Sequence, residues 1–191
     1  MDEDRLVAAL RQRDAEGAQE LVRCCGDRLL RSAFLLCGNP TEAQDLVQET
    51  FVQAWKSAHR FRGGSSVYTW LHGILLNLSR HYHRDRQRLV CDDALAERNL
   101  PAPEEPVSGS DADAASASLA AALGRLSGPH REVVVLRFYE DLKTHEIAGR
   151  LGISPGTVKS RLHYAIAELQ KMLPREMNLF GAGGTNKRET T

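Results

Sequence analysis

Apolar residues recur at helical spacing through the first half of the chain. After Asp14, which can cap a helix, one face collects Ala18, Leu21, Val22, Cys25, Leu29, Ala33 and Leu36. Gly38 is expected to end this helix. The next helix begins at Asn39-Pro40 or between Thr41 and Gln44, because both stretches offer helix-start chemistry.

The second predicted helix has an apolar and a polar face. Its inward positions are Ala43, Leu46, Val47, Phe51, Ala54 and Trp55. Its outward positions are Asp45, Gln48, Glu49, Val52 and Gln53. Two glycines and two serines within residues 61–66 then predict a loop. A further helix resumes near Tyr68 and continues through an arginine-rich stretch.

The second half of the chain carries a helix-turn-helix pattern. Ile147, Ala148 and Leu151 form the inner face of a short helix, and Gly152 suits a left-handed turn. Ser154 is a good N-cap and Pro155 suits the first turn of the next helix. Such a second helix enters the major groove with its N-terminal residues against the bases. The expected DNA contacts are Ser154, Pro155, Gly156, Thr157, Lys159, Ser160, Arg161 and His163.

Between the two helical parts the composition changes. Three prolines and an excess of acids mark residues 91–113 as a flexible acidic linker. The fold class is therefore predicted to be all-α, with small helical domains at residues 4–90 and 114–173 and a disordered tail at 174–191. The net charge is zero, but basic blocks flank the acidic linker. Local fields of this kind can steer a protein to phosphates.

Motifs in both halves resemble those of the extracytoplasmic-function (ECF) sigma factors of the sigma-70 family. Residues 45–51 (DLVQETF), 61–63 (FRG), 68–71 (YTWL) and Asn77 resemble its region 2. Residues 126–136, 145–148 (HEIA) and 156–162 (GTVKSRL) resemble its region 4. The resemblance covers nearly the whole chain except the linker and the tail. It implies a factor that carries core RNA polymerase to promoters.

The resemblance also implies roles for residues in the first half. The residues implied to dock on the β′ and β subunits of the polymerase are Asp45, Gln48, Glu49 and Gln53. The residues implied to contact the −10 promoter element are Gly63, Gly64, Ser65, Tyr68, Asn77, Arg80, Arg84 and Arg86. In the family, the loop that corresponds to residues 63–67 captures a base flipped from the duplex. Asn77 matches a residue of the pocket that holds this base. The alternative for Tyr68 and Trp70 is a position in the hydrophobic core instead of a DNA contact, and we favour this alternative for Trp70.

Partners and location follow from the same resemblance. The whole chain resembles the family members that control cobalt and nickel resistance, which implies a membrane-anchored anti-sigma factor. Without a signal peptide or a membrane-spanning apolar run, we expect a cytoplasmic protein that this partner can hold at the inner membrane. The alternative function is a stand-alone helix-turn-helix regulator. The cysteines and histidines lack metal-ligand spacing, so we expect no metal. No nucleophile motif, phosphate loop or paired-carboxylate pattern stands out, so we also expect no cofactor, small-molecule substrate or catalytic activity.

Overall fold

The computed structural model describes residues 3–12, 15–92 and 111–173. Among these residues there are helices and turns but no strand, which confirms the all-α prediction. The chain divides into two compact units, residues 1–103 and 104–191. Each unit contains one of the two helical domains that the sequence predicts.

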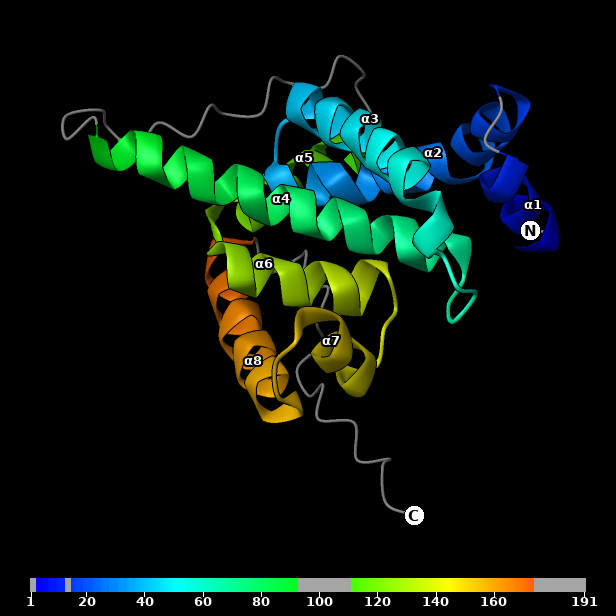
Figure 1. Ribbon diagram of the computed structural model, residues 1–191. Helices are drawn as coiled ribbons and strands as arrows, with labels where there is room; N and C mark the ends of the chain where they lie inside the picture. The colour runs from blue at the N-terminus through cyan, green and yellow to red at the C-terminus, as the bar shows by residue number, and fades with distance from the viewer. Residues whose placement is uncertain (1–2, 13–14, 93–110, 174–191) are drawn as a thin grey trace. The chain divides into compact units, whose positions relative to one another are not determined.

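The first unit is a helical bundle. Its elements are α1 (Glu3–Gln12), α2 (Ala15–Cys37), α3 (Pro40–Ser57), the 3₁₀ turn η1 (Ala58–Arg60) and α4 (Val67–Asp92). Helix α2 packs against α1, α3 and α4, and α3 also packs along α4 (Figure 1). The arrangement leaves the loop between η1 and α4 at the end of the bundle where α4 begins.

Leucines fill the core of this bundle. Leu6 and Leu10 of α1, Leu29 of α2 and Leu71 and Leu75 of α4 are all fully buried. Each such side chain stabilises the fold by about 1.5–3 kcal/mol relative to an exposed one. A polar pair shares this core, because Ser32 Oγ lies 2.8 Å from His72 Nε2 and neither residue is exposed. The pairing satisfies two polar groups that would be costly to bury alone.

The boundary between α2 and α3 follows the chemistry of two residues. Gly38 adopts φ 78° and its N–H donates to the Phe34 carbonyl, which ends α2 as predicted. Asn39 is the N-cap of α3, because its Oδ1 accepts from the Glu42 N–H at 3.0 Å. Of the two predicted starts, the chain therefore uses Asn39-Pro40.

One prediction about the face of α2 is wrong, and one buried residue of this face was not predicted. Val22 is 50% exposed, although the pattern places it inward. The buried stripe instead runs through Leu21, Cys25 and Leu29, so Val22 lies at its edge, about 100° around the helix from Leu21. The stripe also includes Ser32, a polar residue that the pattern does not mark.

The second unit is built around the longest of its helices. Its elements are α5 (Asp111–Arg125), α6 (Gly128–Val134), the π-helical turn η2 (Val135–Tyr139), α7 (Thr144–Leu151) and α8 (Pro155–Met172). Helix α8 packs against α5, α6 and α7. Buried Arg131 of α6 donates to the carbonyl oxygens of Gly124, at 2.6 Å, and Leu126, at 3.2 Å. A cation on these carbonyls stabilises the C-terminal end of α5.

The limits of the predicted linker need a correction. Cys91 and Asp92 belong to α4, and Asp111–Asp113 belong to α5. Helix formation thus continues past both predicted ends of the linker, where residues such as Leu89 and Ala114 favour it. The rest of the linker and the predicted tail at 174–191 lie outside the described residues.

Candidate nucleic-acid interface

Helix α3 presents an exposed acidic face, formed by Asp45, Gln48, Glu49, Val52 and Gln53. Asp45 and Gln48 are exposed, whereas Glu49 and Gln53 are half-buried. The Gln53 side-chain amide donates to Glu49 Oε1 at 2.7 Å. Val52 is 43% exposed in the middle of this face. Val52 adds apolar area to an otherwise polar face, on which Asp45 and Glu49 carry the negative charge.

The loop between η1 and α4 projects from two held ends. Gly63, Gly64 and Ser65 are exposed, and Gly63 adopts φ 76°, a conformation that glycine reaches without strain. The rings of Phe61 and Trp70, one on each side of the loop, lie 5.4 Å apart. Trp70, predicted as a core residue, is half-buried against the core through this contact.

Tyr68 is the one expected DNA contact that the structure places in the core. Its side chain is 6% exposed, and the Arg28 guanidinium lies 4.0 Å from the centre of its ring. A ring covered in this way cannot stack on a base without leaving its site. Tyr68 therefore has the core position that the sequence offered as its alternative.

A polar strip runs along the outer face of α4, formed by Asn77, Arg80, His81 and Arg84. These positions are three, four and seven residues after Asn77, so they share one side of the helix. Asn77, His81 and Arg84 are exposed, and Arg80 is half-buried. Arg84 Nη2 lies 2.9 Å from His81 Nδ1. Arg86 lies in the last turns of α4, where side chains are outside the described part.

His81 belongs to this strip, although it was not among the residues expected to contact DNA. The nearby His83 does not belong to it. His81 lies between Asn77 and Arg84 on the exposed side, and its helical spacing from both was the available signal. His83 instead points inward, with Nε2 3.0 Å from the Leu36 carbonyl oxygen. Asn77 lies about 15 Å along the helix axis from Val67. Asn77 thus lies nearly three helical turns beyond the end of the loop.

The helix-turn-helix of the second unit has the geometry that the sequence predicts. Gly152 adopts φ 66° and ends α7, and the Ile153 N–H donates to the Ala148 carbonyl at 3.1 Å. Ser154 Oγ then accepts from the Thr157 N–H at 3.1 Å and caps α8. Ile147, Ala148, Val158 and Ala165 are buried between the two helices. The tight turn therefore holds the start of α8 at the surface.

The exposed start of α8 contains the residues expected to contact DNA. Ser154, Pro155, Gly156, Lys159, Ser160 and His163 are exposed. Thr157 and Arg161 are half-buried, and the Thr157 hydroxyl lies 2.9 Å from Ser154 Oγ. Tyr164, which the sequence reading did not include, is 61% exposed beside the ring of His163. The only indication of Tyr164 in the sequence is its position, one residue after His163, the last expected contact.

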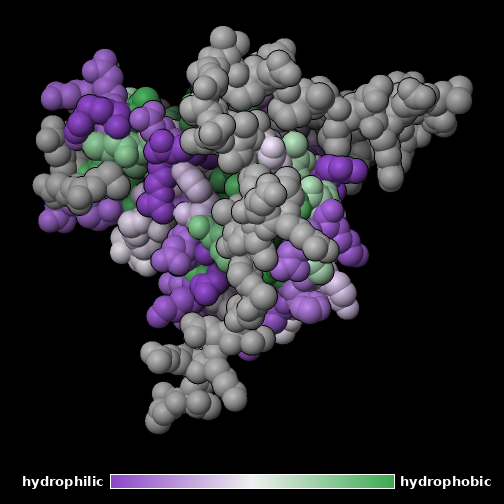
Figure 2. All heavy atoms as spheres, turned by 180° about the vertical axis from the view of Figure 1, so that it is seen from behind, coloured by the Kyte–Doolittle hydropathy of each residue, from purple (hydrophilic) through white to green (hydrophobic). Residues whose placement is uncertain are grey.

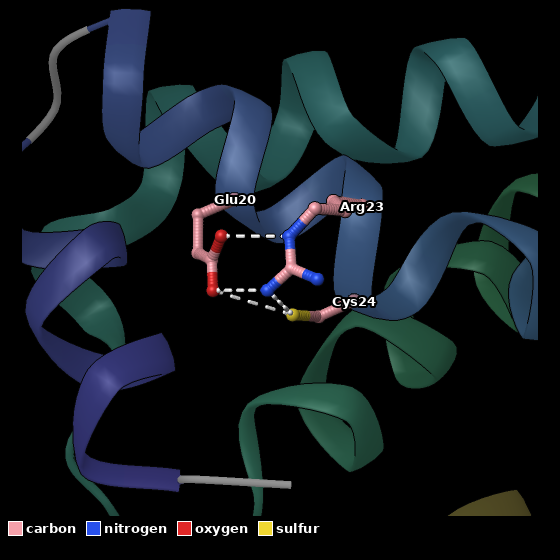
Figure 3. A network of polar contacts seen from close by, with 3 residues as sticks. All are labelled: Glu20, Arg23 and Cys24. Atoms are coloured by element: carbon pink, nitrogen blue, oxygen red, sulfur yellow. Dashed lines mark hydrogen bonds and ion pairs between the residues drawn. The ribbon is translucent and has the colours of Figure 1, made fainter.

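The cysteines of α2 belong to packing and a local polar network. Cys25 is fully buried, and burial raises the pKa of its thiol to about 11, with the charges of Cys24 and Glu3 adding to the effect. Cys24 is half-buried, and its Sγ lies 3.5 Å from Glu20 Oε1 (Figure 3). Arg23 bonds both oxygens of Glu20, at 3.0 and 2.8 Å, which raises the pKa of the guanidinium. Among the described residues no cluster of histidines, cysteines and acids could hold a metal ion.

Hydrophilic residues cover much of the surface seen in Figure 2, with hydrophobic side chains in smaller areas between them. None of the described helices combines the length and the apolar character needed to cross a membrane.

Comparison with known proteins assigns both units. The family model described as Sigma-70 region 2 matches residues 21–89, and that described as Sigma-70, region 4 matches residues 122–171. The RNA polymerase sigma-E factor of Streptomyces coelicolor is 34% identical over 81% of this chain and 85% of its own length. The ECF sigma factor SigE of Mycolicibacterium smegmatis is 37% identical over 82% of this chain, which spans 61% of that relative. The chain belongs to the ECF RNA polymerase sigma factors.

Two solved structures are similar to this sigma factor over most of its length. The sigma factor RpoE of Bartonella quintana, in complex with the anti-sigma factor NepR, has 30% identity and a TM-score of 0.64, covering 81% of this chain and 94% of that chain. CnrH, in complex with the cytosolic domain of CnrY, has 28% identity and a TM-score of 0.63, covering 89% and 96%.

Membership of the family establishes the function in outline. This sigma factor binds core RNA polymerase and promoter DNA and directs transcription initiation. A stand-alone regulator would carry a ligand-binding or phosphate-receiving domain in its first half. Region 2 occupies that half instead, so the alternative loses the feature that would distinguish it.

Proposed function

We propose that this sigma factor holds one promoter at two places while its first unit binds the polymerase. The acidic face of α3 docks on the β′ and β subunits. The loop at 63–65 and the polar strip of α4 contact the −10 element, and the start of α8 contacts the −35 element. The observation that carries the proposal is the distribution of charge among the helices, acidic on the outer face of α3 and basic on α4 and at the start of α8.

Run-off transcription tests this assignment. The purified chain is mixed with a bacterial core RNA polymerase and a library of genomic fragments, and the transcripts identify the promoters. We expect transcripts that depend on the sigma factor and begin at a small set of sites. Tight binding to duplex DNA without polymerase, combined with no transcripts, would instead support the stand-alone regulator.

Replacing Asn77 tests the −10 contact. In Asn77→Ala, we expect promoter opening to slow by about tenfold, because a base-edge hydrogen bond is worth about 1–3 kcal/mol. Initial binding of the holoenzyme should change little. Permanganate reactivity of unpaired thymines reports opening, and a gel-shift assay reports binding. Gln19→Ala removes an exposed amide from α2 and is the matched control. Equal losses of binding and opening in Asn77→Ala would contradict this role.

We also propose control by an anti-sigma factor anchored in the inner membrane, which would hold the otherwise cytoplasmic chain there. In the two similar structures, RpoE is bound by the anti-sigma factor NepR, and CnrH is bound by the cytosolic domain of CnrY. Both complexes support this proposal. Cell fractionation should find the sigma factor with membranes before induction and in the soluble fraction afterwards. From the resemblance to family members that control cobalt and nickel resistance, we further propose that its promoters control a stress or metal-resistance operon. Recovery of promoters unrelated to stress or metal resistance would contradict that assignment.

The proposed role requires no catalytic activity from this chain, since the polymerase supplies the chemistry. The described side chains fulfil binding roles: acids for the polymerase, amides and hydroxyls for bases, and cations for phosphates.

A further inference from the structure

The first turn of α4 has three N–H groups whose acceptors are identified, and one of these acceptors comes from a distant part of the chain. Ser66, the residue before the helix, accepts from the Thr69 N–H through Oγ and from the Trp70 N–H through its carbonyl, both at 3.0 Å. The Val67 N–H donates to Glu3 Oε1. Glu3 therefore connects α1 to the helix start at which the exposed loop ends.

The packing of α1 places the Glu3 carboxylate. Leu6 and Leu10, on the same helix, are 1% and 0% exposed and belong to the core of the first unit. Glu3 itself is half-buried, whereas Asp4 beside it is exposed. The two buried leucines hold α1 in place, and this positions the Glu3 carboxylate beside the Val67 N–H.

The surroundings of this contact are equally well held. Val67 is fully buried, and Tyr68 is buried beneath the Arg28 guanidinium. Groups from α1 and α2 thus hold the first two residues of α4.

The exposed part of the loop contrasts with these held ends. The Phe61 and Trp70 rings join its two sides, and Ser66 caps the helix that follows. Between them, Gly63, Gly64 and Ser65 are exposed. A short segment between fixed ends has fewer conformations to lose when it orders around a ligand.

We propose that Glu3 is a positioning residue for promoter opening: its carboxylate fixes the Val67 N–H and thereby the place from which the loop at 63–65 reaches the −10 DNA. The inference rests on the proposed role of that loop. Glu3 contacts no DNA itself and acts through the start of α4. An anion at a helix N-terminus is stabilising there, because the unpaired N–H groups carry partial positive charge.

Three variants of the full-length chain separate the contact from the charge. Glu3→Ala removes the acceptor and the charge. Glu3→Gln removes the charge and retains a carbonyl oxygen that can accept the hydrogen bond. Asp4→Ala removes the neighbouring, exposed charge from the same turn and is the matched control.

Hydrogen exchange measured by NMR on the chain alone tests the contact. In Glu3→Ala, the Val67 amide should exchange about tenfold faster, while the amide of Leu75, deeper in α4, should be unchanged. In Asp4→Ala and Glu3→Gln, the Val67 amide should stay protected. Unchanged Val67 exchange in Glu3→Ala would overturn the inference.

Promoter opening by the holoenzyme tests the consequence, on a promoter fragment recovered by run-off transcription. We expect Glu3→Ala to slow permanganate-detected opening by about fivefold, with polymerase affinity and duplex binding retained. Glu3→Gln should restore most of the rate. Equal losses of opening and polymerase affinity would show a merely structural role and would overturn the inference.

The Asn77→Ala variant distinguishes this failure from failure of the proposed function. If opening slows in Asn77→Ala but not in Glu3→Ala, the inference is wrong and the −10 assignment stands. If neither variant slows opening, the −10 assignment is wrong and the inference falls with it.

Discussion

Exposure separates the residues at the start of α8 into two groups with different roles. Lys159, Ser160 and His163 are exposed and able to reach a duplex directly. Thr157 and Arg161 are half-buried, and the Thr157 hydroxyl is engaged with Ser154. Thr157 therefore supports the N-terminus of the helix, whereas Lys159 is available to provide the charge for DNA that the proposed function requires.

Replacing Lys159 or Arg161 with alanine should weaken binding of the holoenzyme to the upstream promoter element by about tenfold, because a lost contact costs about 1–3 kcal/mol. If Lys159 contacts a phosphate, the salt dependence should also decrease by about one counterion. Titrations at several salt concentrations measure both effects. Lys171→Ala removes an exposed charge from the far end of α8 and is the control. A loss of polymerase affinity in Lys159→Ala would contradict the division of roles between the units.

The buried thiol of Cys25 should make stability depend on pH. Burial raises its folded pKa to about 11 from an ordinary value of 9.0. The stabilisation is therefore complete below about pH 9 and is lost as the pH rises toward about 11, where the folded thiol also ionises. Urea unfolding of the wild type and of Cys25→Ala between pH 8 and about 11 checks this. The wild type should lose more stability over this window; parallel curves would refute the effect.

At the scale of elements, the turn between α7 and α8 depends on one backbone conformation. Gly152 adopts φ 66°, and a Cβ added there would have no heavy atom within 4 Å. The cost of a side chain at Gly152 is therefore conformational and not steric. Gly149, inside α7, has equally open surroundings without a positive φ.

The two glycines should respond to alanine in opposite directions. Gly152→Ala should destabilise the chain by about 1 kcal/mol, because the left-handed region is unfavourable for a residue with a Cβ. Gly149→Ala should stabilise it by about 0.5–1 kcal/mol, since alanine favours a helix interior. Thermal unfolding followed by circular dichroism measures both variants. The same sign of change in both would contradict the conformational explanation.

Much at the element scale was predictable from the sequence, because its signals are local. Asn39-Pro40, Gly38, Gly152 and Ser154 act on backbone groups within four residues of themselves, and each bounds a helix in the structure. The inner faces were also largely predictable from helical period. Val22 was not, because the pattern cannot say where a covering helix ends.

At the scale of the whole molecule, the proposed function requires the two units to reach two promoter elements about 50 Å apart, one and a half turns of DNA. A flexible chain of the length between α4 and α5, residues 93–110, would span roughly 23 Å on average and about 60 Å when extended. Its reach therefore exceeds the requirement only when the chain is stretched.

Shortening the linker should separate polymerase binding from promoter recognition. Deleting residues 94–103 reduces the extended reach between α4 and α5 to about 26 Å, too short for both elements. We expect run-off transcription to be lost while polymerase affinity is retained. Replacing the same residues with glycine and serine, at constant length, should retain transcription. Full activity of the deletion would show that the linker is not stretched between the sites.

The helices, the helix-turn-helix with its cap and turn, and the family could all be predicted from the amino-acid sequence, since each depends on residues close together along the chain. Three features emerged from the packing of the helices: Tyr68 is covered by Arg28, Glu3 reaches Val67, and His81 joins the strip with Asn77 and Arg84 while His83 binds the Leu36 carbonyl. Burial and long-range hydrogen bonds depend on which helices pack together. No local pattern contains that information, because a helical period defines a face but not its neighbour.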